Sequence, residues 1–570
     1  MSFAIIGAIY PNNGILQGIA PDFMAIVVPA RQAWNHIPMR FLRLTALLAV
    51  VAVAGAGCGP PADSPPDPGN SRKNAVLHRG NGGDPGTLDP ALAEDIHAFG
   101  VLADLHEGLL APGAAGELLP GVAASWDISD DGLIYRFALR EDARWSNGDP
   151  VVAGDFIRAF RRISASDTPS AYGFLFEAVE NFTAIKSGAR GPEELGVVAD
   201  NHHALTIRLE RPTGYFLSVL AMPVAAPMHA DAAYTATDAD NGYISNGPYA
   251  LASRRPGGPI ALRRNTRYWD AGTVAIDSVV YHPIADEVAE LNRFRSGELD
   301  ITHSIPPSHI DSMRRSRPDE TRIAAELALY YLALDATEPP LDDPHVRQAL
   351  SMAIDRERLV AIVGRGELPA YGIVPPGVAG YDGPQFEWRH WKRTRRERAA
   401  RELLESADFH NSRPLTLTYL YDAGSVHEKI ALAVGGMWRD VLGIHVSYDK
   451  REWQHFLDTR ANRDEWQVMR FSWFGDFNDP VTFLGLFASD SVHNLPAYKD
   501  AGYDRLLEQA ENTVAAPARA RLLEQAEERF LQSHAVIPLY FYVSKHMVNA
   551  SLRGFRDNVL NIHPSRFLAF

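Results

Sequence analysis

The sequence has almost no cysteine and no extended run of basic residues. Cys58 is the only cysteine among 570 residues, so the chain beyond it can form no internal disulfide bond. The net charge is -15, with 55 Lys and Arg against 70 Asp and Glu. Proteins that bind nucleic acid concentrate positive charge, so this balance argues against a nucleic acid partner. Stability must come from size and a hydrophobic core.

The sequence also lacks the short motifs that mark common catalytic and phosphate-binding sites. It contains no GxSxG, no HExxH and no cysteine nucleophile beyond Cys58, which argues against a hydrolase. The glycine cluster GNGGDPG at 80–86 does not match GxGxxG, and no Walker lysine follows it. The histidines lack metal-ligand spacing, and His202 and His203 adjoin in a polar turn. We therefore predict no enzymatic activity, no cofactor and no metal site.

One hydrophobic run near the N-terminus has the pattern of a secretory signal. Arg40 and Arg43 precede the apolar stretch 44–54, and the small residues 55–57 lead directly to Cys58. The apolar run is shorter than the ~20 residues that a transmembrane helix needs. The pattern therefore favours a cleaved signal over a membrane-spanning anchor.

The cysteine that follows the small residues resembles a bacterial lipobox, in which the thiol is acylated. Gly55 departs from that pattern, because a larger aliphatic residue is usual there. We predict a lipoprotein signal peptide over 39–58, lipidation of Cys58 and attachment to a membrane through the lipid; cleavage nearby with a free thiol is the alternative. Residues 1–38 do not fit the signal, and we interpret them as preceding the true start. The Pro-, Ser- and Gly-rich residues 59–69 predict a flexible tether.

The rest of the chain alternates predicted strands with predicted helices. Its length exceeds what one hydrophobic core supports, so about two or three domains are expected. Strands are predicted at 135–139, 258–270, 276–284, 415–422 and 444–450. Helices are predicted from about 153, within 286–300 where Gly297 closes the helix, and at 343–363, 390–407 and around 427–442. This alternation is typical of α/β lobes.

Several segments, in order along nearly the whole of this part, carry a recognisable pattern. They are TLDPALAE with DLHEGLL, LLPGVAASWDISDDGLIYRFALREDARWSNGDPVVAGDFIRAFRR, SNGPY, LRRNTRYWD, NRFRSGELDIT, DDPHVRQALSMAIDR, LPAYG, EWQHFLDTR and AVIPLYFYV. Together they resemble the oligopeptide-binding proteins of bacterial ABC importers, solute-binding protein family 5. The resemblance implies an α/β, two-lobed periplasmic-binding-protein fold of type II with an extra inserted domain, three domains and a hinge. The implied limits are 70–106, 231–327 and 544–570 for domain I, 107–230 for domain II and 328–543 for domain III.

Two opposite charges lie within the apolar stretch MRFSWFGDFNDP at 469–480, although charged residues are seldom buried unless paired. Strand periodicity would turn Arg470, Ser472, Phe474 and Asp476 the same way, and six steps of about 3.3 Å span roughly 20 Å. The resemblance implies that this strand pairs with the backbone of an extended peptide, with Asp476 at the α-ammonium group and Arg470 at the carboxylate end. We expect a peptide of roughly three or four residues. An internal charge network that closes the two lobes is the alternative.

The resemblance implies further ligand contacts around this strand. They are Glu94 and Ile96 on the first lobe, Tyr172, Tyr331, Trp453 and Tyr542 around side-chain pockets, Arg460 and His427 at carboxylate ends, and the strand residues Ser472, Trp473 and Phe474. Core packing is the alternative for each pocket aromatic, and a solvated helix start is the alternative for His427. Asp422 and His303 stand where the family has asparagine, which leaves the preferred length and charge of the peptide open. An extra carboxylate at Asp422 would disfavour acidic peptides or favour a basic residue.

The resemblance implies a solute-binding protein that captures short oligopeptides between two lobes. The resemblance implies delivery of the peptide to the membrane subunits of an ABC permease, for transport, by a monomer in the periplasm. One alternative is a receptor for murein tripeptide or another peptide-like ligand. A secreted hydrolase and a sensory or chaperone-like protein are less favoured.

Overall fold

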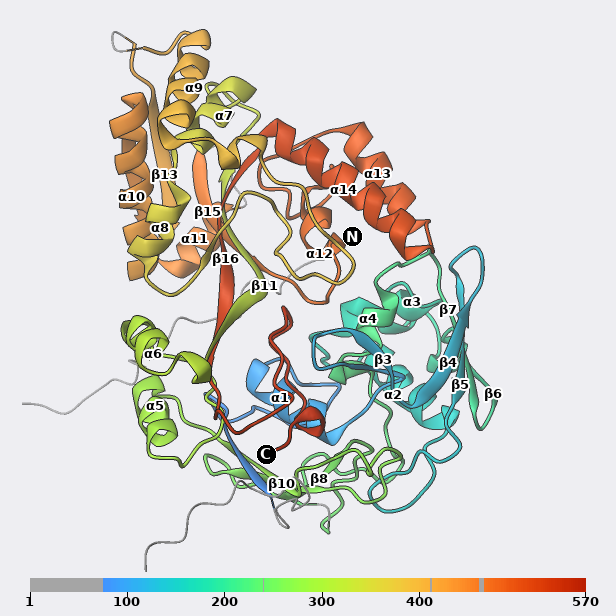
Figure 1. The fold of residues 1–570 in the computed structure, drawn as a ribbon. Coiled ribbons are helices and arrows are strands. Elements are labelled where there is room, and N and C mark those ends of the chain that lie inside the picture. The colour runs from blue at the N-terminus through green and yellow to red at the C-terminus, as the bar shows by residue number, and fades with distance from the viewer. Residues whose placement is uncertain (1–74, 239, 411–412, 461–465) are drawn as a thin grey trace, which may run out of the picture. The chain divides into compact units, whose positions relative to one another are not determined.

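Three larger sheets and a two-stranded ribbon organise the part of the chain that the computed structural model describes, residues 75–238, 240–410, 413–460 and 466–570 (Figure 1). The predicted signal peptide with Cys58, the predicted tether and residues 1–38 lie outside these ranges. Inside them, no helix has both the length and the apolar character needed to cross a membrane. The α/β class predicted from the sequence is confirmed.

The first sheet joins the beginning of the described chain to its middle, in the order β1-β10-β9-β8. Its strands are β1 (Val76–Gly80), β8 (Tyr249–Ser253), β9 (Ile260–Arg264) and β10 (Ser278–His282), with β1 parallel to β10. The helices of this part are α1 (Ile96–Leu105), α5 (Glu287–Arg295) and α6 (Ile310–Ser316). Buried side chains from α1, from this sheet and from the C-terminal segment form one hydrophobic cluster, so distant segments complete this part of the fold.

The second sheet follows the order β4-β5-β7-β6. Its strands are β4 (Ala123–Ile128), β5 (Ile134–Leu139), β6 (Val197–Asn201) and β7 (Ala204–Arg208), beside the ribbon of β2 (Leu110–Pro112) and β3 (Leu118–Pro120). The helices are α2 (Ala153–Ser164), α3 (Phe182–Lys186) and α4 (Phe216–Val219). Tyr135, Phe137 and Leu139 are buried on β5, as the two-residue period of a strand requires.

The third sheet has the order β12-β16-β11-β15-β13-β14 and contains the strand predicted to meet a peptide. Its strands are β11 (Thr321–Leu334), β12 (Leu368–Pro369), β13 (Thr416–Asp422), β14 (His445–Arg451), β15 (Val468–Phe474) and β16 (Val536–Met547). The helices are α7 (Pro344–Ala353), α8 (Arg356–Val363), α9 (Arg393–Ser406), α10 (Ser425–Leu442), α11 (Trp453–Arg460), α12 (Val481–Leu484), α13 (Ala501–Glu511) and α14 (Ala516–Ser533). Figure 1 shows β11, β15 and β16 side by side. One face of β11 packs with α7, α8 and α10, and the other with α12, α13 and α14.

One predicted helix proves to be two. Residues 343–363 form α7 and α8, because Asp355 takes an extended backbone conformation and its carboxylate accepts from the N–H of Arg358 at 3.1 Å. Aspartate is among the residues that best cap a helix in this way. The helix α5 ends as predicted before Gly297, whose φ of 80° suits glycine at a helix end.

The buried hydrophobic residues form clusters that combine distant segments. One cluster draws on 77–105, 234–301 and 548–568, and two others lie within 327–559. A further cluster spans 91–244 and also contains Phe477. The domain limits implied by the resemblance stay a prediction.

Candidate functional site

One edge of β15 is partly open. The strand pairs with β11 over its whole length, but β13 pairs with its other edge only at Val468 and Met469. From Arg470 to Trp473, no strand of the described ranges pairs with that second edge. Backbone donors and acceptors left open at a strand edge are a template for another extended chain. The open edge is therefore the main feature of the candidate site.

Asp476 lies beyond the end of this strand. β15 ends at Phe474, and the backbone N–H of Gly475 then donates to the carbonyl oxygen of Leu327 at 2.7 Å. The N–H of Asp476 is 3.3 Å from Oγ1 of Thr482. The prediction that one regular strand reaches Asp476 is wrong, because the chain bends after Phe474. The peptide length calculated from six regular steps therefore does not carry over.

The carboxylate of Asp476 is shielded from water, and no cation or side-chain donor of the described residues contacts it. The side chain is half-buried, and in the described part of the chain no ion pair or side-chain donor stabilises its charge. Burial alone raises the pKa of Asp476 to about 7. A carboxylate in such a place is stabilised as an anion when a cation arrives.

Asp476 lies close to the predicted first-lobe residues. Burial and the negative charges of Asp476, Glu94 and Asp95 together raise the pKa of the Tyr172 phenol. Glu94 is exposed, and so is Ile96, the first residue of α1. The charges of these three carboxylates all act on the phenol, so this end of the site favours a cationic group on a ligand. Tyr172 is thus within electrostatic reach of the predicted contacts Asp476 and Glu94.

Arg470 is already paired inside the protein. Its Nε donates to Oδ1 of Asp422, the last residue of β13, and its Nη2 pairs with the same oxygen. The two side chains are 8% and 9% exposed. His427 lies beside them, with Nε2 3.8 Å from Oδ2 of Asp422 and Nδ1 3.1 Å from the hydroxyl of Tyr330. Burial and the charge of Arg470 hold the pKa of His427 well below its usual range, so the imidazole is neutral. This end of the site contains an internal ion pair within one sheet.

The alternate residues of β15 share a face with Tyr542 of β16. The hydroxyls of Ser472 and Tyr542 are 2.9 Å apart, and the rings of Phe474 and Tyr542 are 4.9 Å apart. Arg470 is close enough to lower the pKa of the Tyr542 phenol, although burial outweighs it and raises that pKa. The predicted common face is confirmed from Arg470 to Phe474.

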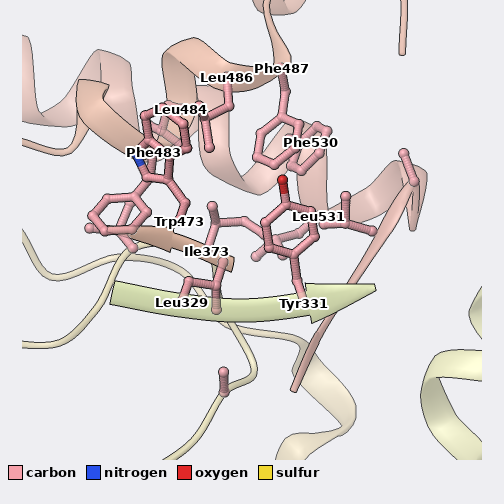
Figure 2. Close-up of a cluster of buried hydrophobic side chains, with 14 of the residues drawn as sticks. Leu329, Tyr331, Ile373, Trp473, Phe483, Leu484, Leu486, Phe487, Phe530 and Leu531 are labelled. Carbon is pink, nitrogen blue, oxygen red and sulfur yellow. The ribbon is translucent and has the colours of Figure 1, made fainter. Parts of the chain in front are cut away.

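The side chains of Tyr331 and Trp473 belong to the hydrophobic core. Figure 2 shows both among Phe483, Phe487 and Phe530. Tyr331 is fully buried, and its ring meets that of Phe487 edge-on at 5.9 Å. Core packing, the alternative for the pocket aromatics, therefore describes Tyr331, and Trp473 has only its backbone at the open edge.

The helix α11 holds two predicted contacts in different surroundings. Trp453 is 37% exposed, and its ring lies 5.7 Å from the guanidinium carbon of Arg470. Arg460 instead lies 5.5 Å from the ring of Phe471, a core residue on the opposite face of β15. Burial lowers the pKa of Arg460, and no carboxylate of the described ranges pairs with it. The two arginines predicted for the carboxylate end of a ligand therefore have different neighbours.

Known proteins resemble this chain over most of its length. A profile described as bacterial extracellular solute-binding proteins, family 5 Middle, matches residues 117–494. The chain belongs to this family. It is 33% identical over 529 residues to the periplasmic oligopeptide-binding protein OppA of Salmonella typhimurium, covering 91% of this chain and 96% of that protein. It is 33% identical over 481 residues to the periplasmic murein peptide-binding protein MppA of Escherichia coli, covering 83% and 89%.

A solved structure of the family gives the same result for the fold. The unliganded open form of the murein tripeptide-binding protein MppA matches with a TM-score of 0.83 at 31% identity. The match covers 87% of this chain and 98% of that structure. The family recognised from the sequence and the multidomain α/β architecture are both confirmed.

Sequence reasoning missed two features of this family 5 site. Phe477, directly after Asp476, stacks on Tyr215 with ring centroids 4.2 Å apart and lies in the hydrophobic cluster of the second sheet. An aromatic residue inside a polar turn was the signal for this contact. The pairing of Asp422 with Arg470 was also missed. The sequence singles out Asp422, but its partner lies 48 residues away on a neighbouring strand.

Proposed function

We propose that this family 5 protein captures short peptides and delivers them, chemically unchanged, to the membrane subunits of an ABC permease. The observation that carries the proposal is the open edge of β15, followed closely by the uncompensated carboxylate of Asp476. An extended peptide would pair its backbone with the edge and place its α-ammonium group against Asp476. Backbone pairing does not depend on side chains, so many peptide sequences would bind. The names of OppA and MppA support this ligand class.

The setting we propose is the periplasm, with the protein acting as a monomer. The relatives OppA and MppA are named as periplasmic proteins. Peptide would be bound outside the cytoplasm and released to a permease in the membrane. We propose binding without catalysis, because family 5 is defined by solute binding.

The decisive experiment is to identify the ligand that the purified protein carries. Mild denaturation is expected to release a mixture of short peptides, and native mass spectrometry before and after this step detects them. Calorimetry with unrelated tripeptides and tetrapeptides should then give similar affinities. If no peptide of about two to eight residues is carried or bound, the proposal is wrong.

A receptor for murein tripeptide is the second candidate. The TM-score of 0.83 with the MppA structure is the observation that favours it. Recovery of one muropeptide from the protein, with weak binding of ordinary tripeptides, would select this candidate. Recovery of peptides of mixed sequence would select the general oligopeptide receptor.

Peptide affinity is expected to rise with pH up to about neutrality. The pKa of Asp476 is about 7 in the ligand-free protein, whereas a bound ammonium group favours the ionised carboxylate. Below that pKa, binding must first remove a proton, so affinity should fall by up to about tenfold for each pH unit. Calorimetry at pH 6 in buffers of different ionisation enthalpy would show proton release on binding. The variant Asp476→Asn should release no proton, and a wild type that releases none would contradict the assignment.

We also propose that Cys58 carries a lipid. Its position after a signal-like segment is the support for this. Labelled palmitate fed to the native host should enter the wild type and not Cys58→Ser, and the wild type should partition with membranes. Unlabelled wild type recovered entirely in the soluble fraction would contradict lipidation.

A further inference from the structure

We infer that Asp422 determines ligand specificity, by pairing with Arg470 so that this end of the site accepts an uncharged amide group rather than a free carboxylate. The inference rests on the proposed peptide function and concerns the same site. Two kinds of peptide fit this description. One extends beyond Arg470, so that a backbone peptide group lies beside the guanidinium, and the other ends beside Arg470 in a carboxamide.

The geometry of the pair supports this inference. Asp422 uses one edge of the guanidinium, formed by Nε and Nη2, and Nη1 takes part in neither contact. Phe456 and Trp453 hold the group, with ring centroids 5.1 Å and 5.7 Å from its central carbon. Arg470 is therefore fixed in place, and the N–H donors of Nη1 remain for a ligand.

The charges around Arg470 decide which ligand group suits the N–H donors of Nη1. The positive charge of Arg470 is matched by Asp422, and His427 is neutral. Arg365 also acts on His427, but more weakly than Asp422 does. A ligand carboxylate at Nη1 would share one guanidinium with a second, buried carboxylate, and like charges this close oppose each other. A peptide carbonyl accepts the same hydrogen bond without that repulsion.

The opposite end of the site strengthens the preference. Asp476, Glu94 and Asp95 make the region around Tyr172 negative. With the Arg470 end neutralised, the charge that a ligand meets at the Asp476 end is negative. A peptide amide with one positive charge therefore complements it better than a zwitterionic tripeptide does.

The test compares a peptide with its own amide. Trialanine and trialanine amide are titrated into the wild type and into Asp422→Asn. The wild type is expected to bind the amide at least as tightly as the free acid. The variant, in which Arg470 regains its net charge, should bind the free acid about tenfold more tightly than the wild type, with little change for the amide.

A matched control removes a carboxylate from another arginine pair. Asp557 pairs with Arg322 at 2.7 Å, with side chains 34% and 38% exposed. Asp557→Asn should leave both affinities unchanged. If the wild type prefers the free acid by about tenfold or more, or if Asp422→Asn leaves the acid-to-amide ratio unchanged, the inference is overturned. Should Asp422→Asn not fold, the acid-to-amide ratio of the wild type still decides. If neither trialanine nor its amide binds either protein, the inference is overturned, whereas the proposed function fails only when no peptide of about two to eight residues binds.

Discussion

Asp476→Asn is expected to weaken the binding of a free tripeptide by about 2–5 kcal/mol, roughly 30-fold to several-thousand-fold in Kd. The ligand ammonium group would then meet a neutral amide in place of the carboxylate, in a site where burial has already removed much of the water. N-acetylated peptides should bind the wild type poorly and should not distinguish the wild type from the variant. Isothermal titration calorimetry measures all four affinities.

The control for this variant is Asp490→Asn, which removes an exposed carboxylate a short way along the chain. It should leave the Kd unchanged. The ligand-free Asp476→Asn protein should also be at least as stable as the wild type at pH 8. Because the pKa of Asp476 is raised in the folded state, its contribution to stability is present at low pH and is lost as pH rises toward 7. Equal affinities for free and acetylated peptides would show that Asp476 is not the anchor.

Glu107→Gln is expected to lower the free energy of unfolding by about 3–5 kcal/mol, because it leaves a buried arginine without its counter-charge. The carboxylate of Glu107 accepts from Nη1 of Arg566 at 2.8 Å and from Nε1 of Trp269 at 2.7 Å, and also from the hydroxyl of Tyr268. The side chains of Arg566 and Glu107 are 9% and 2% exposed. Urea denaturation followed by tryptophan fluorescence measures the loss.

An exposed pair of the same chemistry is the control for Glu107→Gln. Arg190 and Glu194 are 3.0 Å apart, with side chains 49% and 44% exposed. Glu194→Gln should cost about 1 kcal/mol or less. Adding Arg566→Met to Glu107→Gln should recover part of the stability, because the unpaired charge is gone. If Glu107→Gln and Glu194→Gln lower the free energy of unfolding by similar amounts, burial adds nothing to the stabilising effect of the Glu107 pair.

Local patterns were enough to predict most elements of the fold. The alternation in β5 and the glycine that ends α5 are properties of neighbouring residues, so the sequence displays them directly. The division between α7 and α8 was missed because Asp355 fits a helical pattern equally well as an interior residue. Only its extended backbone shows that it begins a new helix.

The site could be predicted in part, and the limit lies in long-range pairing. The common face of Ser472 and Phe474 follows from strand periodicity alone. Strand periodicity cannot predict which face of β11 carries the side chain of Tyr331, because both faces of that strand are buried and hydrophobic. The partner of Arg470 depends on β13 lying beside β15, which periodicity within either strand cannot indicate.

The way in which the first sheet is completed affects when this protein can fold as it is synthesised. Nη1 of Arg79, on β1, donates to the carbonyl oxygen of His563 at 2.7 Å and to Oγ of Ser565 at 2.9 Å, across 484 and 486 positions. The N–H of Ser565 donates in turn to Asp104 at 2.8 Å. The ribosome makes the chain from its N-terminus, so β1 is available long before these partners. β1 must therefore wait for the last residues of the chain, and this part of the fold stays unfinished until synthesis ends.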